Sequence, residues 1–158
     1  MNESDKLRKQ IAAVLDWGDA HVTFEAAVAD FPAKLRGVRP EGLPHSGWEL
    51  LEHIRIAQWD MLEFSRDPKH VSPEWPKGYW PESPAPPSAK AWAESVRRFQ
   101  ANRKQFQKLI LDPANDLLMP LPHGKGQTLL REALLTADHT SHHLGQLILV
   151  RRAVGAWK

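Results

Sequence analysis

The spacing of apolar residues constrains the fold of this chain more than any other feature. Four stretches place apolar side chains three or four residues apart, which is typical of an amphipathic α-helix with one face turned toward a core. Each stretch ends at or just before a proline or a glycine. We therefore expect four helices, over residues 4–30, 46–67, 88–112 and 128–152.

Two of these helices carry specific end signals. Ser46 precedes the second stretch and Glu49 follows three residues later, so the two residues can cap the first free amides reciprocally. In the last stretch Arg151 and Arg152 occupy the final turn, where cations are favourable, and Gly155 follows as a stop. No strand pattern and no internal repeat competes with the helices.

The segment between the second and third helices, residues 66–87, is long and unusual. It holds seven prolines together with Trp75, Tyr79 and Trp80, and its aromatic residues favour an ordered crossover over a disordered linker. A crossover of this length can return to the starting end of the bundle, so the second and third helices can run parallel. We expect an all-α four-helix bundle, and the connections permit an up-down-down-up order.

Size and charge exclude several classes of protein. A chain of 158 residues predicts one domain, which we assign to residues 1–158. The 21 Lys and Arg nearly balance the 19 Asp and Glu, so nucleic-acid binding is not indicated. No stretch has the roughly 18 apolar residues of a membrane span, and the N-terminus lacks the apolar region of an export signal. We expect a soluble, cytoplasmic protein.

The histidines are the residues best suited to bind a metal. The chain has no cysteine, which excludes disulfides, thiolate ligands and a cysteine nucleophile. His139 and His143 lie four residues apart and project from one face of the last helix, one turn apart. The same spacing presents two nitrogen ligands in zinc metalloproteases, which carry a catalytic Glu between them. That Glu is absent here, and the pair alone is a weak signal.

A third histidine lies on the apolar face of the second helix. His53 falls between Leu50 and Ala57, where an unpaired imidazole costs about 1–3 kcal/mol. If core-facing side chains converge, His53 completes a three-nitrogen site with His139 and His143, with positions left open for water or substrate. In the alternative, His53 hydrogen-bonds to a neighbouring carboxylate or carbonyl, and the other two lie on a partly wet surface. Spacing alone does not decide between them.

Two segments together resemble the DinB-like superfamily of bacterial four-helix bundles. They are Trp48-Glu-Leu-Leu-Glu-His-Ile54 and Asp138-His-Thr-Ser-His-His-Leu-Gly-Gln-Leu147, and the resemblance covers nearly the whole chain, crossover included. It implies an up-down-down-up bundle with a divalent ion, zinc or nickel, held by three histidines that match His53, His139 and His143. The family often has tyrosine before the last ligand, where this chain has His142, so no role of a tyrosine carries over.

The resemblance also implies an activity. Members of that superfamily include transferases that join a low-molecular-weight thiol such as bacillithiol to an electrophile, a mycothiol-dependent isomerase and metal-dependent hydrolases. In all of them a bound cation can lower the pKa of a thiol or water and supply a nucleophile. We therefore expect a metal-dependent transferase that acts on a small-molecule substrate and forms a homodimer. A metal-dependent hydrolase and a non-catalytic bundle that binds metal or ligand in a stress response are the alternatives.

Five further residues could support the ligands. His142 points about 100° away from the histidine pair, so we expect it at the surface or behind the ligands. His21 lies near the inner face of the first helix and could pack beside them. Gln146, Glu49 and Asp138 are candidates to orient a ligand ring or a bound water.

Aromatic residues could also wall a pocket, because ligand sites are commonly apolar clefts with a few polar groups. The candidates are Trp59, Trp75 and Trp80. The remaining histidines, which lie beside prolines or a glycine in the connections, are expected as ordinary surface residues: His45, His70 and His123.

Overall fold

The computed structural model describes residues 2–157, and its regular structure is helical. This confirms the predicted all-helical fold. Apart from one isolated bridge between Pro120 and Thr128, residues 2–157 contain no β-structure. None of the helices in this range is both long and apolar enough to cross a membrane. In chain order the elements are α1 (Glu3–Val14), α2 (Phe24–Val28), η1 (Ala33–Leu35), α3 (Gly47–Arg66), η2 (Lys77–Tyr79), α4 (Ala91–Leu111) and α5 (Leu129–Ala153), where η denotes a 3₁₀ helix.

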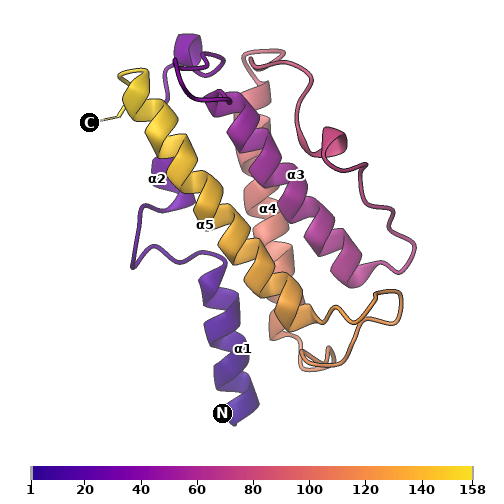
Figure 1. Cartoon of the computed structure of the whole chain (residues 1–158). Helices are drawn as coiled ribbons and strands as arrows, with labels where there is room; N and C mark the ends of the chain where they lie inside the picture. The colour runs from indigo at the N-terminus through magenta and orange to yellow at the C-terminus, as the bar shows by residue number, and fades with distance from the viewer. Residues whose placement is uncertain (1, 158) are drawn as a thin grey trace.

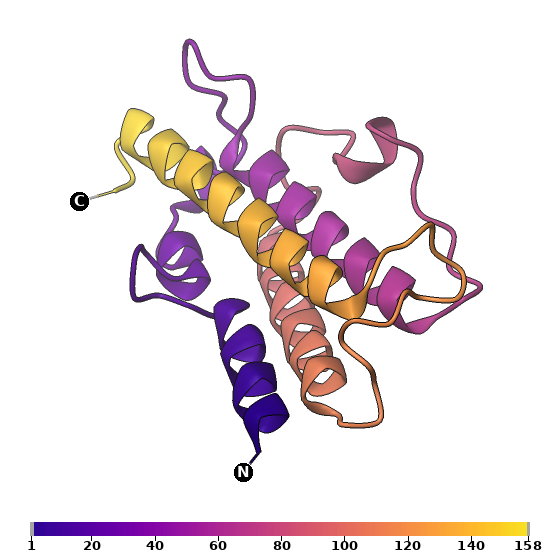
Figure 2. The same cartoon turned by 60° about the horizontal axis from the view of Figure 1, so that its bottom comes forward.

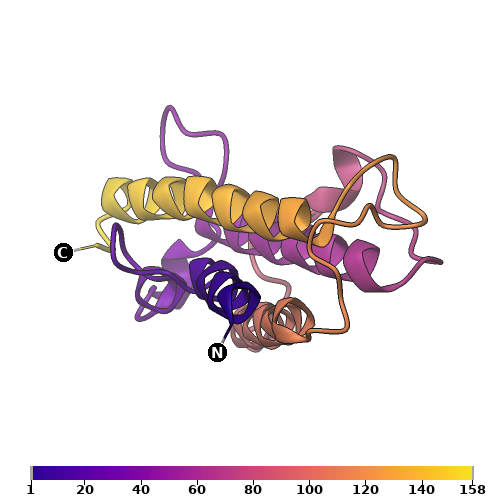
Figure 3. The ribbon, with the colours of Figure 1, turned by 90° about the horizontal axis from the view of Figure 1, so that it is seen from below.

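The three long helices, α3, α4 and α5, form the body of the molecule (Figure 1). α3 packs against both α4 and α5, and α1 packs against α4 and α5. In Figure 1, α3 and α4 run downward, whereas α1 and α5 run upward. Seen from below, α5 and α3 form one layer and α1 and α4 the other (Figure 3).

α3 begins where its sequence signal predicts. Ser46 Oγ accepts a hydrogen bond from the Glu49 amide at 3.2 Å, and the Glu49 carboxylate accepts one from the Ser46 amide at 2.8 Å. The helix ends at Arg66, before Asp67-Pro68. α5 begins after Thr128, whose hydroxyl caps it. α4, which corresponds to the third predicted helix, begins at Ala91, three residues later than Ser88, and has no side-chain cap.

The first predicted helix, residues 4–30, is wrong as a single element. The chain leaves α1 after Val14 and enters the short helix α2 only at Phe24. Thr23 begins α2, because its hydroxyl accepts a hydrogen bond from the Ala26 amide at 3.2 Å. At Gly18 the chain turns so tightly that a Cβ there would lie 2.5 Å from the Thr23 methyl group. Figure 2 shows the resulting loop between α1 and α2.

Two apolar clusters fill the interior. One surrounds the first half of α3 and the end of α5, and the other surrounds the end of α3 and the start of α5. The histidines of interest lie on α3 and α5 at the level where one cluster gives way to the other. The largest side chains of the first cluster are Phe24, Phe31, Trp48, Trp92 and Phe99, and the largest of the second is Phe106.

Candidate metal centre

Three histidines from two helices meet between α3 and α5. The Nε2 atom of His53 lies 3.1 Å from Nε2 of His143 and 3.1 Å from Nε2 of His139. Ligand-capable nitrogens of all three lie within 4.8 Å of one another. His53 is 2% exposed and the other two are partly buried. The packing of α3 on α5 therefore places three imidazoles around one point.

Hydrogen bonds on the far side of two rings determine which nitrogens carry protons. His53 Nδ1 lies 2.9 Å from the Tyr79 carbonyl oxygen, which can only accept, so Nδ1 is the donor. His143 Nδ1 lies 2.7 Å from Gln146 Oε1 and is likewise the donor. In the neutral rings both Nε2 atoms then carry bare lone pairs, and these face each other. Such a pair is repulsive unless a cation or proton lies between the two nitrogens.

The environment keeps these imidazoles neutral. Burial lowers the pKa of His139 to about 3 and that of His143 to about 4, and the neighbouring imidazoles act in the same direction. Burial also lowers the pKa of His53, partly offset by the Tyr79 carbonyl. Metal ligands must be deprotonated, so the three side chains are in the state that metal binding requires.

This donor set fits a divalent transition metal. Imidazole nitrogen suits zinc and nickel, and a hydrogen bond to the distal ring nitrogen is the usual support for a metal-binding histidine. His53 and His143 both have that support. Three protein nitrogens also leave coordination positions for a small molecule, as catalytic sites require.

Two further aromatic rings extend the cluster. The sequence alone did not link either of them to His53. The Trp80 indole stacks on His53 with centroids 3.9 Å apart and an interplanar angle of 1°. The His45 ring stacks on Trp80 at 4.0 Å. The expectation that His45 is an ordinary surface residue is therefore wrong, because its ring packs against the residue that covers His53.

A polar network behind Tyr79 holds the crossover against α3. The Tyr79 hydroxyl donates to Asp60 at 2.6 Å, and the His70 imidazole contacts the other oxygen of the same carboxylate at 2.7 Å. The side chain of His70 is 9% exposed, which makes the expectation of a surface residue wrong. Burial, with Asp60 acting in the same direction, raises the pKa of Tyr79 to about 12.

Two cavities lie along the bundle on either side of the histidines. The larger, about 320 Å³, lies toward the start of α5 and includes His139 in its wall. The second, about 220 Å³, lies toward the end of α5 and includes His45 and Gln146. Its other lining residues are apolar. Only the larger cavity reaches a histidine of the cluster directly, whereas the second reaches it through Gln146, which contacts His143.

The predicted supporting residues divide into two groups. Gln146 contacts His143, and its amide nitrogen lies 3.0 Å from Nε2 of His142, an exposed residue at the edge of the cluster. Asp138 is exposed. The Glu49 carboxylate is occupied by the Ser46 cap and by an ion pair with Arg39. The capping signal thus accounts for Glu49 without any role at the histidines.

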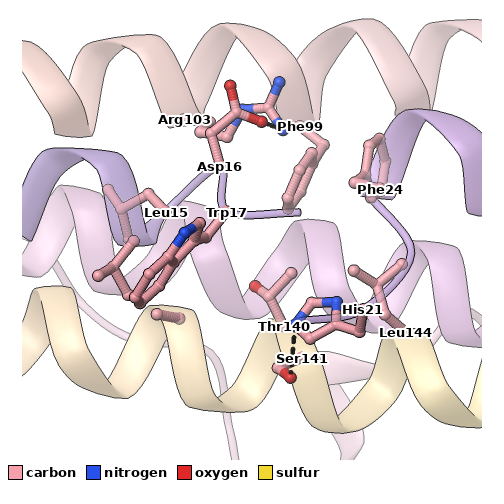
Figure 4. A pocket seen from close by; sticks show the side chains of 12 residues that line it. Leu15, Asp16, Trp17, His21, Phe24, Phe99, Arg103, Thr140, Ser141 and Leu144 are labelled. Atoms are coloured by element: carbon pink, nitrogen blue, oxygen red, sulfur yellow. Dashed lines mark hydrogen bonds and ion pairs between the residues drawn. The ribbon is translucent and has the colours of Figure 1, made fainter. Parts of the chain in front are cut away.

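His21 lies in the loop between α1 and α2. It packs against a different face of α5 from the face that carries His139 and His143. Its Nε2 contacts the Ser141 hydroxyl at 3.1 Å, in a cavity of about 30 Å³ beside Trp17 and an ion pair of Arg103 with Asp16 (Figure 4). This cavity has room for only about one or two water molecules. His21 therefore belongs to the α1–α2 loop and not to the three-histidine cluster.

The three tryptophans have different surroundings. Trp80 covers His53, and Trp75 lines the larger cavity while remaining 70% exposed. Trp59 packs edge-on against His70 at 5.2 Å. His123 is partly buried, with Nε2 2.6 Å from the Phe64 carbonyl oxygen. It is thus tied to the end of α3 and is not a free surface residue.

Sequence reasoning did not identify Tyr79 and Asp60 as parts of the site. Neither residue belongs to a local motif, and their contacts join the crossover to α3 across 19 residues. The one available signal was the concentration of aromatic residues in the crossover, which indicated order but no partner.

Comparison with known proteins gives one family. Residues 18–147 match the family model described as the DinB superfamily. The match runs from the loop after α1 into the last third of α5 and includes all three histidines. No curated protein and no solved structure matches the chain.

Proposed function

Because this chain belongs to the DinB superfamily, we propose that His53, His139 and His143 hold a divalent ion, zinc or nickel, in a metal-dependent transferase. The reaction joins a low-molecular-weight thiol to an electrophilic small molecule. The observation that carries the proposal is the 3.1 Å approach of His53 Nε2 to the Nε2 atoms of both other histidines.

When bound, the ion supplies positive charge that lowers the pKa of a thiol at an open coordination position. The protein's own residues position the ligands. The Tyr79 carbonyl and the Gln146 side chain each hold a proton on Nδ1 of a histidine, which directs the Nε2 lone pair inward. Trp80 covers His53 and shields it from water.

The two cavities favour transfer between two molecules over hydrolysis of one. A transferase needs room for a thiol and for an electrophile next to the same ion, whereas a hydrolase needs room for one substrate and a water. The cavity of about 320 Å³ reaches His139, and the cavity of about 220 Å³ begins at Gln146, which contacts His143, so there is room for two molecules near the histidines.

The same proposal extends to the architecture. We assign residues 1–158 to one domain with the up-down-down-up helix order of a four-helix bundle. The directions of α1, α3, α4 and α5 in Figure 1 support this order.

Metal content tests the site. Untagged protein purified without metal-affinity resin should contain zinc or nickel near one equivalent by elemental mass spectrometry. His139→Gln should lose this metal while its circular dichroism stays unchanged. His21→Gln makes the same chemical change outside the cluster and should keep it. Metal-free wild-type protein that also fails to bind added zinc or nickel would contradict the proposal.

Turnover tests the reaction. Metal-loaded protein is incubated with a panel of low-molecular-weight thiols and chlorodinitrobenzene, and both reactants are followed. Transfer consumes thiol and electrophile in equal amounts and requires His139. Consumption of an ester or amide substrate without any thiol would favour the hydrolase. Stoichiometric binding without turnover would favour a non-catalytic bundle.

A further inference from the structure

The larger cavity has a chemical character of its own. Aromatic side chains of Phe64, Trp75 and Tyr79 form part of its wall, and most of its lining is apolar. His139 lies at one end, so the cavity opens directly onto the proposed metal centre. A molecule in this cavity therefore contacts aromatic rings along its body and the histidine cluster at its reacting end.

Charges in the cavity wall are predominantly negative. Asp60 and Glu132 contribute carboxyl groups, and Arg131 is the one cation in the lining, because His139 is neutral. The Glu132 side chain is only 4% exposed, whereas Arg131 is 56% exposed and extends toward the solvent. Arg131 pairs with Oε1 of Glu132 at 2.5 Å. Within residues 2–157 no hydrogen bond engages Oε2 of Glu132, which leaves that oxygen for a ligand.

From this arrangement we infer that the molecule bound in the larger cavity carries a protonated amine, which pairs with Glu132 and lies against the aromatic wall. Carboxylates form charge-assisted hydrogen bonds with ammonium groups, and aromatic faces attract cations. The inference rests on the proposed function only for the location of the reacting end.

The helix geometry also gives the distance that such a molecule must span to reach both Glu132 and His139. Glu132 and His139 lie seven residues apart on α5, which places them about 10 Å apart along the helix axis. An extended molecule with its amine at Glu132 can therefore reach the histidines with the opposite end. A compact amine would fill only part of the cavity.

The test compares three probes with one carbon skeleton and different charge: phenylbutylamine, phenylbutanol and phenylbutyrate. Binding to chelator-treated, metal-free protein is measured by isothermal titration calorimetry near neutral pH. The amine should bind at least about tenfold more tightly than the alcohol, as expected for a charge-assisted hydrogen bond, and the carboxylate should bind most weakly. Glu132→Gln should reduce the preference for the amine to less than about threefold.

Control variants keep the test decisive. Glu41→Gln makes the same chemical change in an exposed loop that does not line the cavity, and it should keep the preference. Leu135→Lys adds a cation to the cavity wall and should abolish the preference even if Glu132→Gln fails to fold.

Equal binding of the three probes, tightest binding of the carboxylate, no binding, or an unchanged preference in Glu132→Gln would overturn the inference. Because no metal is present, these results are independent of whether the histidines bind metal. Repetition with zinc-loaded protein then shows whether the amine and the ion are held together.

Discussion

The backbone carbonyl of Tyr79 accepts a hydrogen bond from His53 Nδ1 at 2.9 Å. This contact joins a buried residue of α3 to a crossover that comes 26 residues later in the chain. The Tyr79 side chain is held in turn by Asp60, which lies on α3 about two helix turns beyond His53. The crossover is therefore attached to α3 at two points, and the orientation of the His53 ring depends on both.

Removal of the Tyr79 hydroxyl tests this attachment. Tyr79→Phe leaves a buried carboxylate without one of its donors, so we expect the free energy of unfolding to fall by about 1–3 kcal/mol. Zinc affinity should fall about tenfold, because support for metal ligands typically contributes that much. Urea denaturation and competition with a chelator measure the two effects. Unchanged metal affinity would show that the carbonyl keeps its place without the side chain.

Gln146 should affect metal affinity more than stability. Gln146→Leu removes the acceptor that holds the proton on His143 Nδ1. We expect zinc affinity to fall about tenfold, with little change in the urea midpoint. His142→Gln, which alters the neighbour of the Gln146 amide nitrogen, serves as the control and should bind zinc like the wild type. Equal losses in both variants would contradict the role of Gln146.

The pH dependence of the metal-free protein follows from its neutral histidines. The folded-state pKa values are about 3 for His139 and about 4 for His143, below the ordinary value of 6.5. Between pH 6.5 and pH 4 the unfolded chain therefore binds protons that the folded chain does not. The loss of stability that these histidines cause should grow as the pH is lowered through this range and level off below both folded-state values.

Urea midpoints of chelator-treated protein at about pH 7.5 and about pH 5 measure this loss. His139→Gln removes one of the groups that take up protons on unfolding, so its midpoint should decline less steeply. A decline of equal slope in the variant would assign the effect to other groups.

Two glycines should respond in opposite ways to substitution by alanine. A Cβ on Gly47 would overlap the ring of Phe31, which is 1% exposed and has no room to move. Gly47→Ala should therefore cost about 1–3 kcal/mol. Around Gly145, in the middle of α5, nothing lies within 4 Å of an added Cβ.

Gly145→Ala should thus raise the free energy of unfolding by about 0.5–1 kcal/mol through helix propensity. Thermal unfolding of both variants beside the wild type gives the comparison. Destabilisation by Gly145→Ala would mean that α5 is closer to another surface than these contacts indicate.

The sequence predicted most of the fold because periodicity and caps are local signals. Ser46 with Glu49 located the start of α3 correctly, and the spacing of His139 and His143 placed both on one helix face. The interruption after Val14 was missed because the apolar spacing continues through the loop. There the Thr23 cap and the tight turn at Gly18 prevailed over the pattern.

The surroundings of the histidines were less predictable because their contacts are long-range. His53 could be expected to need a partner, but neither spacing nor composition identified the Tyr79 carbonyl. His70 was expected at the surface because it lies in a connection beside proline, yet Asp60 holds it in the interior. The sequence allowed two roles for Glu49, as part of the helix cap with Ser46 and as a support for a metal ligand. The cap explains its contacts.

The position of the histidines on two helices has a mechanical consequence. His53 and His139 are 86 residues apart, so an ion bound by both would close a loop of that length. A covalent cross-link that closes a comparable loop stabilises a protein by several kcal/mol, on the order of 4 to 5, mainly by restricting the unfolded chain. In a chain without cysteine, the ion would thus act as a reversible cross-link. The supply of metal would then set the free energy of unfolding of the protein.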